Sequence, residues 1–408
     1  MTEPAATLLV RNVGRLVTCD PERGAAPGVV EGGAVAARDW EICAVGTEGE
    51  VAAHPLAADA VVVDAAGNAV VPGFVDAHSH LVWLGERSDE YAARAAGRSY
   101  EEIADAGGGI RATVAATRAG ELEELVAAAR PRARRMLRSG TTTVEVKSGY
   151  GLEDQAELRQ LAAALALGQD PELPEVLTTY LPLHALPEGD RAGFVERACT
   201  RGVERAARLA RFVDAFCEQG AYTVEECARL LEAGRRVGLG GKLHADQRSR
   251  GGGARLAARL GAVSADHLEH AGDDDLAALA AAGVVGVILP GASLVLGGPP
   301  PPGRRLLEAG ARVAVATDCN PGTCYSESMP LMVALAVALG GLTPAEAVVA
   351  ATAGGAAALG LTDRGVLRPG RRCDLAILDT PHWLDLGYHL GANPVRTVIR
   401  AGRVAAAG

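Results

Sequence analysis

Two histidines separated by one residue, His78 and His80, follow a short apolar run. Because side chains at positions i and i+2 of a strand lie on the same face, both imidazoles can reach one metal ion. His244, His267 and Asp318 each end a later apolar run. Any one of these residues alone is commonly structural. Together, imidazoles and a carboxylate with room for water are typical of a catalytic metal centre.

These residues stand at the ends of short β-branched runs that alternate with long stretches of helical periodicity. The expected strands are 69–76, 141–146, 175–183, 211–217, 240–244, 262–267, 284–289 and 312–318, and the expected helices include 121–138, 152–167, 223–237 and 273–282. Strands alternating with helices over about 250 residues predict an α/β fold, a (β/α)8 TIM barrel, in which the chemistry collects at the C-terminal ends of the strands.

The two ends of the chain depart from this rhythm. Residues 1–68 and 365–408 carry short strands with Gly or Asn turns, which predict a small β-sandwich domain formed from both termini. The barrel would then occupy residues 69–364. An uncharged stretch over 276–303 is interrupted by Pro290 and several glycines, so it predicts a helix and a buried strand rather than a membrane span.

Composition excludes several classes of protein. The 408 residues are 49% apolar and include 40 basic and 50 acidic residues, so the chain is neither disordered nor suited to nucleic-acid binding. Eight singly placed cysteines and an N-terminus without a signal-peptide pattern favour a cytoplasmic location and reduced thiols. Only two basic residues are lysines, Lys147 and Lys242, and both lie close to residues of the predicted site.

Several segments carry a resemblance to a known family. VPGFVDAHSHL, the ADH of the sixth strand and the ATD of the eighth resemble the metal-dependent amidohydrolase superfamily. EVKSGYG and TDCNPGT resemble the branch of that superfamily that acts on 4-imidazolone-5-propanoate in histidine degradation, and the likeness covers essentially the whole chain. The resemblance implies a hydrolase in which a metal-activated hydroxide opens the cyclic amide to N-formimidoyl-L-glutamate. It also implies a homodimer with a small-molecule substrate and neither a nucleic-acid nor a membrane partner.

The resemblance implies a specific set of metal ligands. His78, His80, His244 and Asp318 would bind one Zn²⁺ or Fe³⁺ per subunit. Superfamily members with two metal ions carry a carboxylated lysine at the end of the fourth strand. Here that strand ends without a lysine, so one ion is expected, and Glu218 is a further candidate ligand.

The substrate-binding residues that the resemblance implies are Arg87, Tyr150, His184, Gln247, Asn320, Gly322 and Thr323. Arg87 and Tyr150 would hold the substrate carboxylate, for which the fork of a guanidinium is well suited. His184 and Gln247 would face the ring, and the loop 320–323 would receive the amino-acid end of the opened product.

Three residues are candidates for proton transfer: His267, Asp318 and Gln247. Some relatives have Glu at position 247, so the Gln found here weakens its role as a general base. The role moves to Asp318 or His267, and the sequence leaves open which of them accepts the proton. Two other functions compete with this hydrolase. A nucleobase deaminase with the same metal cage would need no carboxylate clamp, and an inactive assembly protein would have lost its metal ligands.

Overall fold

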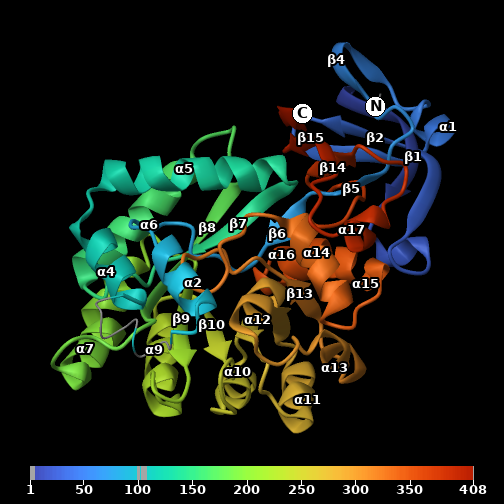
Figure 1. The fold of residues 1–408 in the computed structure, drawn as a ribbon. Helices are drawn as coiled ribbons and strands as arrows, with labels where there is room; N and C mark the ends of the chain where they lie inside the picture. The colour runs from blue at the N-terminus through green and yellow to red at the C-terminus, as the bar shows by residue number, and fades with distance from the viewer. Residues whose placement is uncertain (1–4, 99–101, 103–107, 408) are drawn as a thin grey trace.

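The structure is a computed structural model that describes residues 5–98, 102 and 108–407. It contains a barrel surrounded by helices and a sheet to which both ends of the chain contribute (Figure 1). The N- and C-terminal segments, blue and red in Figure 1, lie side by side in that sheet.

Parallel strands form the barrel in chain order. They are β6 (Phe74–Asp76), β7 (Thr141–Lys147), β8 (Glu175–Leu183), β9 (Phe212–Cys217), β10 (Gly240–Ala245), β11 (Ser264–His267), β12 (Val285–Ile288) and β13 (Val313–Val315). A parallel bridge between Ser79 and Cys319 joins the segments that follow β6 and β13 and so brings the two edges of the sheet together. The expected (β/α)8 barrel is confirmed.

Helices cover the outside of the barrel. The longer ones are α4 (Ile110–Ala119), α5 (Leu122–Arg138), α6 (Asp154–Gly168), α9 (Val224–Arg236), α10 (Gly253–Leu260), α11 (Asp273–Ala282) and α14 (Met329–Ala338). Shorter ones are α2 (Ser88–Ala95), α7 (Arg191–Arg197), α8 (Val203–Ala206), α12 (Pro290–Leu296), α13 (Gly303–Glu308), α15 (Pro344–Val349) and α16 (Gly355–Ala358). The uncharged stretch forms α11, β12 and α12, as expected of a buried segment. None of the helices described has both the length and the apolarity that crossing a bilayer requires.

A mixed sheet unites the two chain ends. Its strands are β1 (Ala6–Val17), β2 (Val29–Arg38), β3 (Glu41–Thr47), β4 (Leu56–Asp64), β5 (Val70–Pro72), β14 (Leu375–Leu378), β15 (Val395–Arg400) and β16 (Arg403–Ala407), with the short helices α1 (Glu48–Val51) and α17 (Asp385–Tyr388) beside them. β14 pairs antiparallel with β5, and β5 pairs parallel with β1, so C-terminal and N-terminal strands are neighbours. The sheet contribution of both termini is thus confirmed.

The prediction of one strand over 69–76 was wrong. Val70–Pro72 belongs to the terminal sheet, whereas Phe74–Asp76 is the first barrel strand. Pro72 has no N–H to continue a ladder, and a Cβ at Gly73 would lie 2.5 Å from the side chain of Thr142. The break at these two residues divides the run into one strand of the terminal sheet and one strand of the barrel.

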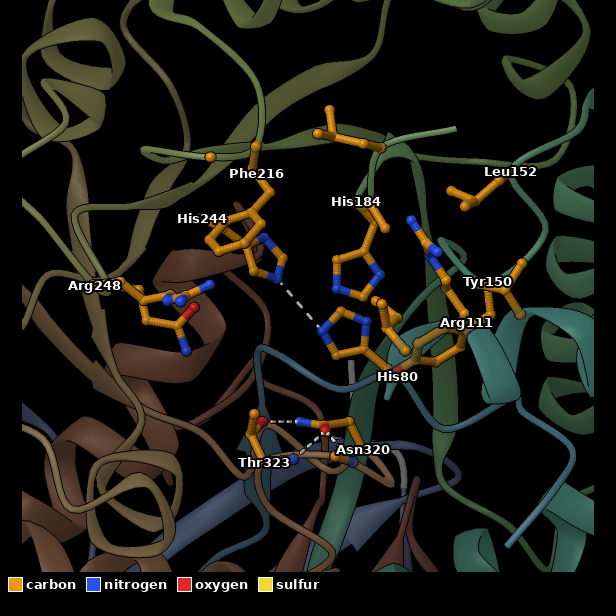
Figure 2. Close-up of a pocket in the computed structure, with 18 of the residues that line it drawn as sticks. His80, Arg111, Tyr150, Leu152, His184, Phe216, His244, Arg248, Asn320 and Thr323 are labelled. Atoms are coloured by element: carbon orange, nitrogen blue, oxygen red, sulfur yellow. Dashed lines mark hydrogen bonds between the residues drawn. The ribbon is translucent and has the colours of Figure 1, made fainter. Parts of the chain in front are cut away.

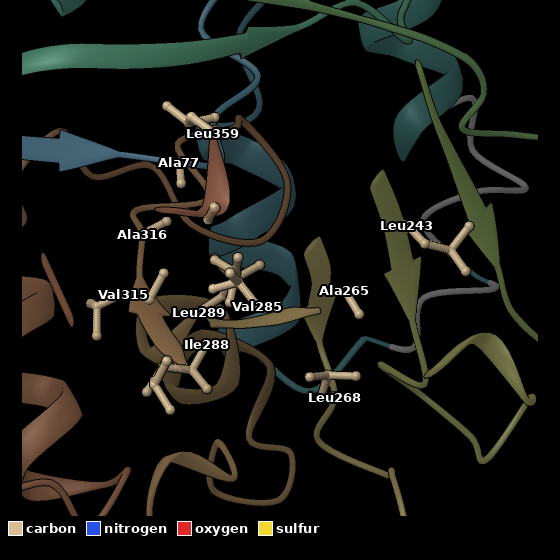
Figure 3. Close-up of a cluster of buried hydrophobic side chains, with 14 of the residues drawn as sticks. Ala77, Leu243, Ala265, Leu268, Val285, Ile288, Leu289, Val315, Ala316 and Leu359 are labelled. Carbon is tan, nitrogen blue, oxygen red and sulfur yellow. The ribbon is translucent and has the colours of Figure 1, made fainter. Parts of the chain in front are cut away.

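Small aliphatic side chains fill the space between the barrel strands and their helices. Leu243, Ala265, Val285 and Val315 of successive strands are all buried in one large cluster (Figure 3). This packing holds the strand ends in register, and the functional residues follow directly from those ends.

Candidate active site

A cavity of about 1300 Å³ opens where the barrel strands end. All the predicted site residues except His78 and the further candidate Glu218 line it, and His78 is fully buried. Figure 2 shows His80, Tyr150, His184, His244, Asn320 and Thr323 around this space. The fold therefore brings together residues that lie far apart in the sequence.

The predicted metal ligands converge at the base of the cavity. His78 and His80 follow β6, His244 lies in β10 and Asp318 follows β13. Nε2 of His78 lies 3.5 Å from Oδ1 of Asp318, and Nε2 of His80 lies 3.6 Å from the same oxygen. The Nε2 atoms of His80 and His244 are 3.4 Å apart (Figure 2). His78, His80 and Asp318 form one group of donor atoms within 4.8 Å of one another, and His244 belongs to overlapping groups with His78 and His267 and with His80 and His184.

Carboxylates lie behind two of these rings. Oδ2 of Asp266 lies 2.6 Å from Nδ1 of His78, and Oδ2 of Asp214 lies 3.0 Å from Nδ1 of His244. At His78 the carboxylate oxygen accepts, so Nδ1 donates and Nε2 keeps a lone pair for a metal ion. Nδ1 of His244 lies beside Asp214 without forming a hydrogen bond to it. Nε2 of His78 is buried and has no hydrogen-bond partner in the described part of the chain. A bound cation would satisfy this atom, so the residues fit a metal ion.

The ligand histidines are suited to metal binding in their protonation state as well. Burial lowers the pKa of His78 and of His80 well below the ordinary value, and the nearby Lys147 and His184, respectively, lower each further. The rings are therefore neutral at neutral pH, as metal binding requires.

A layer of fully buried charges lies beneath the ligands. Nζ of Lys147 donates to Oε1 of Glu145 at 2.9 Å and to Oδ2 of Asp214 at 2.8 Å. Lys242 lies 3.5 Å from Glu145 and 3.8 Å from Asp266. Lys147 also lies 3.5 Å from Asp266. The only lysines of the chain thus neutralise the carboxylates that hold His78 and His244.

Left-handed backbone angles occur at two site residues that are not glycine. His267 has φ +80° and Asp318 has φ +50°. Such conformations cost about 1–3 kcal/mol each and persist only when the surrounding structure imposes them.

Oε2 of Glu269 lies 3.8 Å from Nδ1 of His267. Burial lowers the pKa of His267, but Glu269, Asp318 and Asp266 outweigh it and raise the pKa overall.

The loop after β13 is built around the side chain of Asn320. Its Nδ2 donates to the backbone oxygen of Asp318 at 2.7 Å and to the Thr323 hydroxyl at 2.6 Å. Its Oδ1 accepts from the backbone N–H groups of Gly322 and Thr323, both at 2.8 Å. The Thr323 hydroxyl donates to Oδ2 of Asp318 at 3.1 Å. These contacts orient Asp318, and substrate contact by the loop stays a prediction.

Arg87 lines the cavity with its guanidinium already paired. Its Nε donates to Oε2 of Glu90 at 2.9 Å, and Nη2 lies 2.8 Å from the same carboxylate. A Cβ at Gly322 would lie 2.6 Å from Nη1 of Arg87, which shows how closely the guanidinium and the Asn320 loop approach. Glu90 follows Arg87 by three residues at the start of α2, so the spacing of an i,i+3 ion pair was the available signal.

Aromatic rings form another part of the cavity wall. His184 stacks on His80 with ring centroids 4.8 Å apart, and the Tyr150 ring lies 5.3 Å from His184. Nδ1 of His184 is 3.0 Å from the Gly149 carbonyl oxygen, which can only accept, so Nδ1 donates and Nε2 is an acceptor. Burial, with a contribution from His244, lowers the pKa of His184 to about 3, so the ring is neutral. Gln247 is half-buried and also lines the cavity.

The sequence analysis missed the carboxylates beneath the site. Asp214 and Glu145 stand inside the strands of RFVDAFC and TTTVEVK, and a charged residue in a buried strand was the available signal. Glu218 is in none of the donor clusters formed by the described residues. Its carboxylate accepts from the backbone N–H groups of Gln219 and Arg248, each at 2.8 Å.

Comparisons with known proteins agree with this geometry. The model of the amidohydrolase family matches residues 69–405. The chain is 46% identical to an imidazolonepropionase of Anaeromyxobacter dehalogenans over 99% of its own length and 97% of that protein. It is 46% identical to an imidazolonepropionase of Deinococcus deserti, over 97% of the chain and 98% of that protein.

Solved structures share the fold at low sequence identity. A 5-methylcytosine deaminase from Klebsiella pneumoniae superposes with a TM-score of 0.74 at 20% identity, covering 98% of this chain and 97% of that one. An adenosine deaminase from Xanthomonas campestris with bound zinc gives 0.72 at 22% identity, covering 99% and 93%. The chain belongs to the amidohydrolase family. Within that family it belongs with the imidazolonepropionases.

Proposed function

We infer that this protein hydrolyses 4-imidazolone-5-propanoate to N-formimidoyl-L-glutamate in histidine degradation. The observation that carries the inference is the convergence of His78, His80, His244 and Asp318 at the base of a cavity, in a chain 46% identical to imidazolonepropionases over nearly its whole length. Arg87 lines the same cavity and offers a cation to a carboxylate, which a nucleobase lacks.

The test is turnover of the substrate itself. The loss of imidazolone propionate absorbance is followed with purified protein before and after treatment with a chelator. We expect turnover that the chelator abolishes and that added metal restores. No turnover by metal-loaded protein would refute the proposed reaction.

We propose that His78, His80, His244 and Asp318 hold a single metal ion. No lysine stands at the end of β9, and both lysines of the chain are bound in buried ion pairs. Beneath the site, two ammonium groups face the carboxylates of Glu145, Asp214 and Asp266, and Asp318 adds another carboxylate.

The charge of this buried group supports a divalent ion. The lysines leave a net formal charge of about −2, which Zn²⁺ neutralises and Fe³⁺ would exceed. Asp76, two residues before His78, is also buried, and burial raises its pKa to about 7, so it adds only a partial charge. Metal analysis of the purified protein, with zinc expected, tests the proposal.

The reaction follows from the positions of the chain's own groups. A bound metal ion would polarise the amide carbonyl and lower the pKa of a water molecule. We propose that Arg87 and Tyr150 hold the carboxylate. Nε2 of His184 would accept a hydrogen bond from the ring, and the amide of Gln247 would donate one to it. His267 donates to the carbonyl oxygen under attack. Asp318, whose Oδ2 is held by the Thr323 hydroxyl, accepts the proton of the attacking water and passes it to the leaving ring nitrogen.

Assembly and location are also proposals. A homodimer is supported by the prevalence of two-fold pairs among soluble enzymes, and light scattering on eluting protein tests it. A cytoplasmic location is supported by cysteines that are all free thiols. Cell fractionation with detection of the protein tests that location.

A further inference from the structure

One helix anchors the loop that carries Tyr150. Glu157 lies in the first turn of α6, and its side chain is almost completely buried. Its Oε1 accepts from the backbone N–H groups of Gly151 at 2.8 Å and Leu152 at 2.7 Å. Its Oε2 accepts from the N–H of Gly149 at 2.8 Å. A single buried carboxylate therefore receives several N–H groups of the loop 149–152.

Gln160, one turn further along α6, completes this anchor. Its Oε1 accepts from the backbone N–H of Tyr150 at 3.0 Å, and its Nε2 donates to the carbonyl oxygen of Val82 at 2.8 Å. The second bond fixes which way the amide faces and ties α6 to the segment after His80. Every backbone N–H from 149 to 152 thus ends on a side chain of α6.

The loop needs such an anchor because its backbone is strained and closely packed. Gly149 has φ +114°, and a Cβ there would lie 2.8 Å from Nδ1 of His184. A Cβ at Gly151 would lie 2.5 Å from the backbone nitrogen of Glu157. Leu152 has φ +51°, a left-handed conformation that a leucine adopts only under constraint. Without acceptors for its N–H groups, the loop would relax.

The loop sets the position of two rings of the cavity wall. It carries the Tyr150 ring directly, and the Gly149 carbonyl accepts from Nδ1 of His184 at 3.0 Å. Figure 2 shows both rings side by side in the cavity. Neither Glu157 nor Gln160 is among the described residues that line the cavity. Any effect of Glu157 on substrate binding must therefore pass through the loop.

We propose that Glu157 is a positioning residue that holds Tyr150 and His184 in place for the carboxylate-bearing substrate. The proposal rests on the proposed function, in which Tyr150 contacts the substrate carboxylate. A purely structural role for Glu157 would be to stabilise α6 and nothing else. The two roles differ in whether KM changes.

The test is the Glu157→Gln variant of the metal-loaded protein. The new amide keeps the size of the side chain but presents N–H groups to N–H donors, so at least one loop N–H loses its acceptor. We expect KM for imidazolone propionate to rise about tenfold while kcat changes less than about twofold, since binding rather than chemistry is affected. Metal content stays unchanged. Hydrogen exchange of a peptide covering 148–153 becomes faster.

Glu346→Gln is the matched control. Glu346 also lies in the first turn of a helix, where it closes a capping box with Thr343, but it is absent from the cavity lining among the described residues. It should lower thermal stability without changing KM. If Glu157→Gln fails to fold, Gln160→Leu removes the Tyr150 anchor together with the bond to Val82 and should raise KM in the same direction.

The outcomes separate the possible failures. Faster exchange with an unchanged KM would refute the positioning role, and unchanged exchange would refute the anchor itself. The double variant with Tyr150→Phe should raise KM little beyond the larger single effect, because both changes act on one contact. Absence of turnover by the unmodified protein would refute the proposed function, whereas the exchange result does not depend on substrate.

Discussion

Replacing Asp266 by asparagine separates the role of the buried carboxylate from that of the ligand it orients. Asp266 accepts the Nδ1 hydrogen of His78 at 2.6 Å and lies 3.5 Å from the Lys147 ammonium. Asparagine keeps the shape and an acceptor oxygen but removes the charge. In the unmodified protein the hydroxyl of Ser264 donates to Oδ1 of Asp266. In the variant the amide nitrogen takes the place of that oxygen and faces the same hydroxyl. The ring of His78 becomes a weaker electron donor, and the buried layer loses one negative charge.

The magnitude follows from the kind of hydrogen bond that is lost. A hydrogen bond to a charged group contributes about 1.5–3 kcal/mol and a neutral one about 0.5–1.5 kcal/mol, so removing the charge costs about 1–1.5 kcal/mol. We therefore expect metal affinity to fall about tenfold, since 1.4 kcal/mol corresponds to that factor. This lies at the lower end of the range of about 10–100-fold that is typical of carboxylates behind metal-bound histidines.

The assay is a zinc titration of metal-free protein against a competing chelator, with thermal unfolding of both forms measured alongside. Asp374→Asn is a control for the loss of a buried carboxylate elsewhere, because Asp374 accepts from the Ala401 N–H at 2.7 Å in the region of the terminal sheet. The control should lose stability and keep its zinc affinity. If the zinc affinity of Asp266→Asn stays within about twofold of the unmodified protein, the reasoning is refuted, because the expected fall is about tenfold.

Further predictions concern catalysis, binding and stability. His267→Ala should lower kcat by about 10²-fold or more with metal content unchanged, and steady-state kinetics with metal analysis check this. Arg87→Ala should raise mainly KM, so a variant that loses only kcat would contradict its assignment. Removing the metal should lower the free energy of unfolding by about 4 kcal/mol at metal concentrations about 1,000 times Kd, measured by denaturant titration with and without zinc. Burial raises the pKa of Asp275, but Arg250 and Arg255 outweigh burial and lower this pKa to about 2. The contribution of Asp275 to the free energy of unfolding is therefore present above about pH 4 and lost as the pH falls toward 2. Asp275→Asn should therefore cost about 1–2 kcal/mol at pH 7, after allowance for the exposed arginines, and almost nothing at pH 2 by urea unfolding.

The two lysines illustrate how far a sequence pattern can be taken. Their scarcity and their places near site residues were evident from the sequence, but their purpose was not. Lys147 and Lys242 come from different strands, and their side chains meet the same carboxylates inside the barrel. A strand pattern specifies which side chains point inward, whereas the partner that each one meets depends on the tilt and stagger of eight strands.

Asp266 is a similar case. It stands beside His267 in the sequence, and the structure places its carboxylate against Nδ1 of His78. His267 leaves the regular strand with φ +80°, and its ring also lies against His78, with ring centroids 5.5 Å apart. The nearest residue in sequence is a poor guide to the partner of a strand residue.

The sequence by itself determined the barrel, the sheet contributed by both termini and the set of residues around the cavity. It could do so because alternating strand and helix periodicity is a local property, and because residues at strand ends share one face of a barrel. Only the tertiary structure decided what supports those residues: Asp214 behind His244, Thr323 on Asp318, Glu90 on Arg87 and Glu157 under the Tyr150 loop. Asp214 and His244 come from different strands, whose approach depends on packing, and the other three contacts are local in sequence but depend on the conformations of the loops that form them.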